Sequence, residues 1–147
     1  RNDQQIESVL TRVTEMLDGD VSGKRICLLG LAFNPGTNDV RTSLSLRIAR
    51  SLMSAGASVA AHDPVAIEEA RQLMPEIDYR HDLYDAASGA DLLLLLTSWP
   101  EYGNLDTGRL LEAMQTPLIF DGQNALDSSG LVASGFRYRS VGKPDPE

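Results

Sequence analysis

Residues 23–43 read GKRICLLGLAFNPGTNDVRTS, and this stretch decides the fold that the sequence predicts. A basic lead-in is followed by the apolar run Arg25–Leu29 and by Gly30, a pattern typical of a buried strand entering a turn. A dinucleotide-binding fold would continue with the fingerprint G-x-G-x-x-G, but Leu31 and Ala32 stand after Gly30. Without the second glycine a pyrophosphate cannot approach the turn in the usual way. The loop is therefore either structural or built for a ligand other than a complete dinucleotide.

The alternation of strand and helix continues along the chain. Apolar spacing and turn residues predict strands at 25–29, 58–61, 77–79, 91–97, 117–120 and 136–139, and helices at 44–55, 65–74, 83–87, 106–114 and 128–133. Five consecutive leucines, Leu92–Leu96, indicate a central strand covered on both faces. We therefore expect a doubly wound α/β domain with a parallel sheet of five to six strands flanked by helices.

An extra amphipathic helix precedes the first strand. Residues 4–17 carry apolar side chains at spacings of three and four, and Gly19 marks its end. This apolar stripe either packs on the domain's own sheet or belongs to a longer helix whose partner lies outside the chain. The polar link Asp18–Ser22 slightly favours the second alternative.

Length and charge restrict the classes of function. A chain of 147 residues suits one domain, and a net charge of −8 argues against nucleic acid, which is held by clustered Lys and Arg. The single cysteine, Cys27, excludes an internal disulfide and fits a reducing cytoplasm. No apolar run approaches the roughly 20 residues of a membrane helix, so we expect no membrane association.

Ligands of doubly wound sheets bind outside the carboxyl ends of the strands. Those ends are predicted at 30–41, 62–64, 97–102 and 121–124, which chain order makes neighbours on one edge. Asp63 closes the second strand and is either a ribose-binding acid or, as we favour, the cap of the helix that Pro64 begins. Trp99 either closes the core or stacks on a ligand.

Other chemistry finds little support. His62, His81 and Cys27 lack the spacing of metal ligands, so we predict no metal site. Cys27 lies in the middle of a strand and is expected to be a core residue. Two histidines and no nucleophile elbow leave no basis for a serine–histidine–acid arrangement.

Four motifs resemble one known domain. GLAFNPGTNDVRTS at 30–43, AHDP at 61–64, TSWPEY at 97–102 and DGQN at 121–124 are similar in order and spacing to the C-terminal domain of the UDP-glucose/GDP-mannose dehydrogenase family. The likeness covers roughly residues 22–143.

The resemblance implies a Rossmann-like domain and a division of the chain. Residues 1–20 would be the end of a central connecting helix, 21–143 the UDP-binding α/β domain, and 144–147 a tail. Full-length members oxidise the C6 alcohol of a nucleotide sugar such as UDP-glucose to a carboxylate in two NAD-dependent steps. Their NAD-binding domain and catalytic cysteine precede the central helix, which forms the dimer. The resemblance therefore implies an excised domain with no catalytic residue, inactive alone, from a homodimeric cytoplasmic enzyme.

The resemblance also assigns binding residues. Backbone groups around Phe33, with Leu31 beside it, would hold sugar hydroxyls, and Phe33 would form a wall of the cleft. Asn34 stands where the family usually has a lysine that contacts the sugar region. Gln123, followed by Asn124, stands where the family's DGRN arginine reaches toward substrate.

The resemblance places Arg41 near the NAD phosphates, a role that suits its fork geometry. Thr42 replaces the acid that usually follows this arginine. A charge-assisted hydrogen bond contributes roughly 1.5–3 kcal/mol, so losing the family's lysine and arginine would weaken substrate binding unless other residues compensate.

Two other functions remain open at this stage. The chain could be a divergent, non-catalytic oligomerisation or interaction domain that has lost ligand binding, with Asn34 and Gln123 marking the loss. A free-standing flavodoxin-like or receiver-like domain is less favoured, because neither an acidic cluster nor a convincing flavin phosphate loop follows the first strand.

Overall fold

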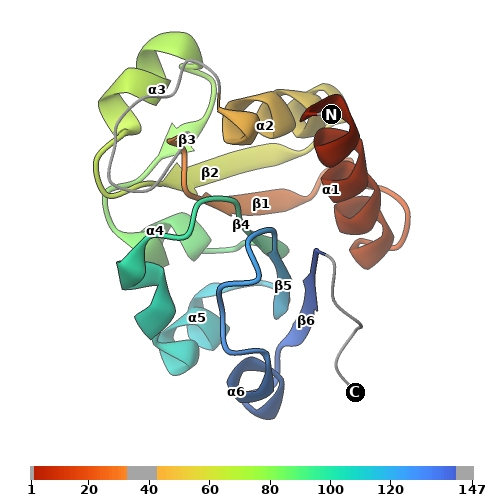
Figure 1. Cartoon of the computed structure of the whole chain (residues 1–147), viewed down its shortest axis with the longest axis vertical. Helices are drawn as coiled ribbons and strands as arrows, with labels where there is room; N and C mark the ends of the chain where they lie inside the picture. The colour runs from red at the N-terminus through yellow and green to blue at the C-terminus, as the bar shows by residue number, and fades with distance from the viewer. Residues whose placement is uncertain (1, 33–42, 142–147) are drawn as a thin grey trace.

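A computed structural model describes residues 2–32 and 43–141, with the side chains of residues 2 and 3 left aside (Figure 1). The described strands form one parallel sheet in the order β3-β2-β1-β4-β5-β6. They are β1 (Arg25–Leu29), β2 (Ser58–His62), β3 (Asp78–Tyr79), β4 (Leu92–Leu95), β5 (Leu118–Asp121) and β6 (Arg137–Ser140). This order is that of a doubly wound Rossmann-type sheet, with its switch point between β1 and β4.

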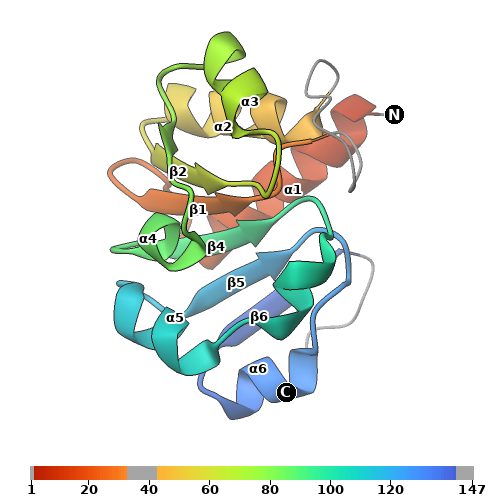
Figure 2. The same cartoon turned by 90° about the vertical axis from the view of Figure 1, so that its left-hand side faces the viewer.

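Helices cover both faces of the sheet, as Figure 2 shows from the side of α4 and α5. They are α1 (Asn2–Met16), α2 (Leu44–Ser54), α3 (Ile67–Leu73), α4 (Leu83–Ala87), α5 (Thr107–Ala113) and α6 (Ser128–Ala133), with a 3-10 helix, η1 (Pro100–Asn104), between β4 and α5. Buried residues of α1, α2 and α3 join one apolar cluster, and those of α4, α5 and α6 join a second. The predicted fold class is confirmed.

The leucine run of β4 shows that this strand is covered by helices on both faces of the sheet. Leu92 and Leu94 pack into the first apolar cluster, whereas Leu93 and Leu95 pack into the second. Successive side chains of a strand point to opposite faces, so a strand between two helical layers must be apolar at every position. The strand spans Leu92–Leu95, which is shorter than the predicted 91–97.

Element boundaries follow the caps that the sequence contains. Ser43 accepts a hydrogen bond from the Leu46 amide at 3.4 Å and caps α2, and Asp106 does the same for α5 through the Arg109 amide. Helix α3 differs from prediction, because it begins at Ile67 with Ala66 as its N-cap. The reading of Asp63-Pro64 as cap and first helical residue is therefore wrong, although the Asp63 carboxylate does organise this turn, as described below.

The apolar stripe of α1 packs on this domain. Val13 is fully buried, Ile6, Val9 and Met16 are nearly so, and all four belong to the cluster between the sheet and α2. The slight preference for a partner outside the chain is therefore wrong for this stripe. Among the described helices none is long and apolar enough to span a membrane.

Candidate functional site

The predicted loops meet at the switch point, beginning with Gly30. This residue has a φ of +97°, and its amide donates to the His62 carbonyl at 2.9 Å. A Cβ built on Gly30 would lie 2.6 Å from the Thr97 nitrogen and 2.5 Å from the Thr97 Cβ. Only glycine permits this backbone conformation and this close approach. The glycine therefore brings the loop after β1 against the loop after β4.

Asp63 connects three of these loops through one buried carboxylate. Its Oδ2 accepts from the amides of Leu31 at 2.7 Å and Ala32 at 3.3 Å, and from the Trp99 indole at 3.1 Å. Its Oδ1 accepts from the amides of Val65 and Ala66, both at 2.9 Å. The residue is 2% exposed. A carboxylate so engaged has little capacity left for a ribose, so the ribose-binding alternative for Asp63 is not supported.

Two further contacts fix the same region. The Thr97 hydroxyl donates to the Ala32 carbonyl at 3.0 Å, so the dipeptide Leu31-Ala32 is held through its amides and a carbonyl. The Tyr102 hydroxyl donates to the His62 carbonyl at 3.1 Å and lies 2.9 Å from Nδ1 of His62. Burial lowers the pKa of His62 and raises that of Tyr102. Both shifts favour the neutral forms of these side chains, which hydrogen-bond to each other and to the backbone at this edge.

The loop after β5 is organised by a second buried carboxylate, Asp121. One oxygen accepts from the Gln123 amide at 3.0 Å, and the other accepts from the amides of Ala125 and Leu126, both at 2.8 Å, and from the Tyr138 hydroxyl at 2.7 Å. A buried carboxylate needs hydrogen-bond donors to offset its desolvation. Asp63, after β2, and Asp121, at the end of β5, thus each organise a loop at the carboxyl edge of the sheet.

Gln123 and Asn124 lie on this edge. The Gln123 side chain donates through Nε2 to the Leu96 carbonyl at 2.9 Å, and the Gly122 amide donates to the Leu95 carbonyl at 2.8 Å. The loop after β5 therefore contacts the end of β4. Asn124 is exposed with a φ of 54°, a left-handed conformation that asparagine tolerates well.

A hollow of about 250 Å³ adjoins Gln123. It lies between α1, α2 and the ends of β4 and β5, with a mostly apolar lining formed by Gln5, Ser8, Val9, Leu44, Ile48, Leu96, Gly122, Gln123 and Val141. A hollow of this size at the carboxyl edge can hold part of a ligand, not the whole of a nucleotide sugar.

The structure brings some predicted site residues together. Leu31, Gln123 and Asn124 all follow the carboxyl ends of β1 and β5, which are separated only by β4. The Leu31 side chain is fully buried and its amide is bonded to Asp63, so a ligand contact would have to use its carbonyl. Phe33, Asn34 and Arg41 lie outside the described residues.

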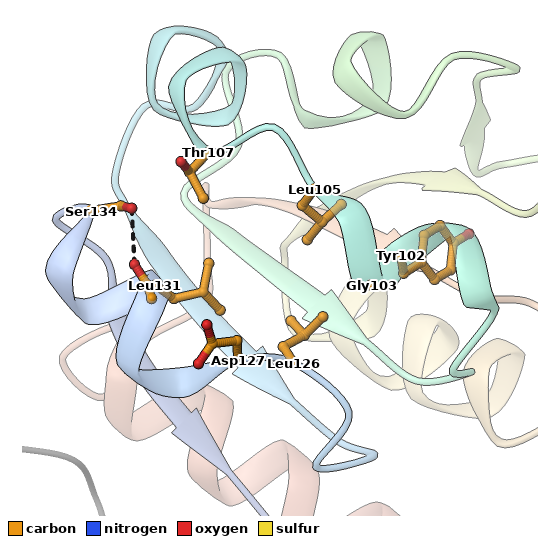
Figure 3. Close-up of a pocket in the computed structure, with 9 residues that line it drawn as sticks. Tyr102, Gly103, Leu105, Thr107, Leu126, Asp127, Leu131 and Ser134 are labelled. Atoms are coloured by element: carbon orange, nitrogen blue, oxygen red, sulfur yellow. Dashed lines mark hydrogen bonds between the residues drawn. The ribbon is translucent and has the colours of Figure 1, made fainter.

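A second cavity, of about 220 Å³, lies between η1, α5 and α6 on the other helical face (Figure 3). Leu105, Leu126 and Leu131 supply its apolar surface, and Thr107 and Asp127 supply polar groups. Neither this lining nor that of the hollow at the sheet edge contains Lys, Arg or His, but only this one contains a carboxylate, Asp127, which repels a diphosphate. We therefore place the nucleotide-binding candidate at the sheet edge.

The predictions on Cys27 and on metals can be compared with the described residues. Cys27 is fully buried in the second apolar cluster, and burial raises its pKa to about 12. A thiol in that environment is inert. Within residues 2–32 and 43–141, no group of three or more His, Cys, Asp or Glu side chains is arranged to hold a metal ion.

Sequence reasoning missed the roles of Asp63, Asp121 and Thr97 in joining the loops. A signal was available for the two acids, because each ends an apolar strand with no Lys or Arg adjacent in sequence. An acid in that position must take N–H or O–H donors from the loops around it. Trp99 is half-buried and donates to Asp63, so it connects the loops as well as packing against the second cluster.

Comparisons with known proteins point to one family. Residues 27–128 match the UDP-binding domain of the UDP-glucose/GDP-mannose dehydrogenase family. The UDP-glucose 6-dehydrogenase of Rhizobium meliloti (strain 1021) is 39% identical over 144 residues, which cover 98% of this chain and 33% of that protein. The UDP-glucose 6-dehydrogenase TuaD of Bacillus subtilis (strain 168) is 37% identical over 144 residues, covering 97% and 31%.

Solved structures show the same likeness. A UDP-glucose dehydrogenase from Pyrobaculum islandicum superimposes with a TM-score of 0.80 at 28% identity, over 97% of this chain and 30% of that one. A UDP-D-ManNAc dehydrogenase from Pyrococcus horikoshii gives 0.71 at 26% identity, over 93% and 30%. This chain thus spans about a third of the length of the curated relatives it matches.

Proposed function

This chain belongs to the UDP-glucose/GDP-mannose dehydrogenase family, and we propose that it is the nucleotide-sugar-binding part of an NAD-dependent UDP-sugar 6-dehydrogenase. The proposed enzyme oxidises the C6 alcohol of a sugar such as that of UDP-glucose to the carboxylate in two steps. In this proposal the chain binds and orients substrate, and the reacting cysteine lies outside it.

One observation carries the proposal. The four motifs that resemble the family are far apart in sequence, yet their described parts meet at one edge of the sheet. Gly30 contacts Thr97, Leu31 is bonded to Asp63, and Gln123 is bonded to Leu96. This edge is where parallel α/β sheets bind ligands.

We assign substrate contacts to this edge. Gln123 and Asn124 present amide groups that can exchange hydrogen bonds with sugar hydroxyls, and the Leu31 carbonyl can accept one. Phe33 and Asn34 complete the proposed sugar-binding set through the loop between β1 and α2. Gln123 is already bonded to Leu96, so a ligand has to share or displace that bond.

The described residues do not fit the main NAD-binding role. The acid after β2, which binds ribose in dinucleotide-binding domains, is Asp63, and its carboxylate accepts hydrogen bonds from protein donors. We therefore propose that NAD binds mainly to a domain outside this chain and that Arg41 reaches its phosphates when the two domains close. We further propose that the longer protein is a cytoplasmic homodimer.

The test is an activity measurement on the longer protein that contains this chain. We expect UDP-glucose to give two NADH per sugar consumed, followed by absorbance at saturating NAD, and GDP-mannose to give much less. UDP-N-acetylmannosamine belongs in the same series, because relatives acting on different UDP-sugars share this fold. If no UDP-sugar produces NADH, the proposed activity is wrong.

A further inference from the structure

Asp63 has hydrogen bonds beyond those of an ordinary turn acid. Its Oδ1 serves its own turn through Val65 and Ala66, whereas its Oδ2 reaches the backbone after β1 and the indole after β4. The local turn needs only the first oxygen. The second oxygen joins the turn after β2 to the loops after β1 and β4. These bonds between loops are not needed for the turn itself and require another explanation.

The contacts of that oxygen lie at the entrance to the proposed sugar-binding loop. Leu31 and Ala32 are the last described residues before that loop, and their amides point to the same oxygen. The Ala32 carbonyl is held from the opposite side by the Thr97 hydroxyl at 3.0 Å. The amides of Leu31 and Ala32 and the carbonyl of Ala32 are therefore all hydrogen-bonded. Both residues are also nearly inaccessible to solvent.

We propose that Asp63 is a positioning residue for nucleotide-sugar binding: its carboxylate sets the direction in which the chain leaves β1 and couples that direction to the loop after β4. This inference rests on the proposed function. Asp63 does not touch the ligand in this arrangement. It acts because sites must be held close to the productive geometry, and a misplacement of about 1 Å can reduce function by roughly a hundredfold.

Trp99 gives this coupling a spectroscopic signature. It is the only tryptophan in the sequence, and its indole shares Oδ2 of Asp63 with the Leu31 and Ala32 amides. A ligand bound at Leu31 and Ala32 changes the electrostatic environment of the indole through this shared oxygen. We therefore expect UDP-glucose to change the intrinsic tryptophan emission of this chain.

The decisive variant is Asp63→Asn. Asparagine suits the local turn, so its oxygen remains with Val65 and Ala66 and its NH₂ group faces the donors of Leu31, Ala32 and Trp99. The variant therefore loses the bonds from Leu31, Ala32 and Trp99 and keeps the turn bonds from Val65 and Ala66. Trp99→Phe removes one donor and leaves the Leu31 and Ala32 bonds. Tyr79→Phe removes the buried bond from Tyr79 to the Met74 carbonyl at 2.8 Å and controls for lost stability away from the site.

Two measurements test the inference. Amide hydrogen exchange on this chain, read by NMR, should show Leu31 and Ala32 exchanging at least about tenfold faster in Asp63→Asn, with β1 and β4 still protected. In the longer protein, UDP-glucose affinity measured by calorimetry should fall by roughly tenfold to a hundredfold, while NAD affinity is unchanged. Tyr79→Phe should alter neither quantity, and Trp99→Phe should alter affinity less than Asp63→Asn.

The outcomes separate the two proposals. If wild-type protein binds UDP-glucose and Asp63→Asn binds it equally well, or if Leu31 and Ala32 exchange is unchanged, the positioning role is overturned and the proposed function stands. If Tyr79→Phe weakens binding as much as Asp63→Asn, the effect is one of stability and the inference also falls. If wild-type protein binds no nucleotide sugar, the proposed function fails and this inference fails with it.

Discussion

At the scale of single residues, Gly30 is the position at which the loops after β1 and β4 touch. We predict that Gly30→Ala destabilises the chain by about 2–4 kcal/mol, because it combines an unfavourable positive φ with a clash against the Thr97 backbone. Urea unfolding measures the change. Gly103→Ala is the matched control, since a Cβ there meets nothing within 4 Å. Equal stability of the two variants would contradict the close approach.

A second residue-scale prediction concerns Gln123. Gln123→Arg should tighten UDP-glucose binding by the longer protein by about tenfold, because a guanidinium adds a charge-assisted bond to an anionic ligand. Calorimetry at low and high salt measures the affinity, and the gain should shrink at high salt. Gln123→Leu is the control and should not tighten binding. A gain that is absent or independent of salt would show that the side chain does not face the ligand's charge.

The candidate site could be predicted from the sequence only in part. The alternation of strands and helices predicts that Gln123 and Asn124 lie at the carboxyl edge of the sheet, where the structure has them after β5. The bond from Gln123 to the Leu96 carbonyl could not be predicted, since it depends on where one side chain turns in space. The sequence around Asp63 indicates only its local turn, because its bonds to Leu31, Ala32 and Trp99 join residues more than 30 positions apart.

At the scale of elements, α1 is the helix whose packing partner differs between the sequence prediction and the structure. Sequence periodicity identifies an apolar stripe but does not say which surface covers it, so the choice between this domain and an outside partner needed the structure. Strands β1, β4 and β5 were easier, because near-continuous apolar runs indicate burial on both faces. The sequence predicts that helix α3 begins at Pro64, three residues before its actual start at Ile67, because an Asp-Pro pair is typical of a helix N-terminus, whereas here the Asp63 carboxylate closes a separate turn through the amides of Val65 and Ala66.

The packing of α1 gives a prediction. Val13→Ala should lower the free energy of unfolding by about 2 kcal/mol, because the Val13 side chain is fully buried in the apolar cluster that α1 forms with the sheet. Thermal or urea unfolding of this chain measures the loss. Thr11→Ala, on the exposed side of the same helix, should change stability by less than about 0.5 kcal/mol. If Val13→Ala is as stable as wild type, α1 does not belong to this folding unit.

The β3 edge of the sheet gives a prediction about pH. Hydrogen bonds from Arg80 and Arg25, each at 2.8 Å, lower the pKa of Asp78 to about 2. A carboxyl whose folded pKa lies below its unfolded value adds stability above the unfolded pKa, and the contribution disappears as the pH falls toward the folded pKa. The Asp78 contribution should therefore be present at pH 7 and be lost between about pH 4 and pH 2.

The size of that contribution is limited by exposure. The Asp78 side chain is 39% exposed, so solvent screening keeps the effect below about 1 kcal/mol. Comparing unfolding of wild type and Asp78→Asn from pH 7 to pH 2 measures it, and the two curves should converge at low pH. A difference that grows as the pH falls would contradict the assigned sign.

At the scale of the whole molecule, the fold is a scaffold that brings four distant segments to one edge. Two buried carboxylates, Asp63 and Asp121, hold the turns of that edge by accepting hydrogen bonds from backbone amides, an indole N–H and a tyrosine hydroxyl. This arrangement leaves the edge rigid before any ligand arrives, which reduces the entropic cost of binding.

The most direct test of the central claim is an NMR titration of this chain with UDP-glucose, with glucose as the control ligand. We predict that UDP-glucose shifts the amide resonances of Leu31, Thr97, Gly122 and Gln123, while the amide resonances of the β3 edge and of α6 stay unchanged. Glucose at the same concentration should leave all of them unchanged. Shifts confined to α5 and α6, or no shift at the carboxyl edge at millimolar UDP-glucose, would contradict the claim that this edge binds the nucleotide sugar.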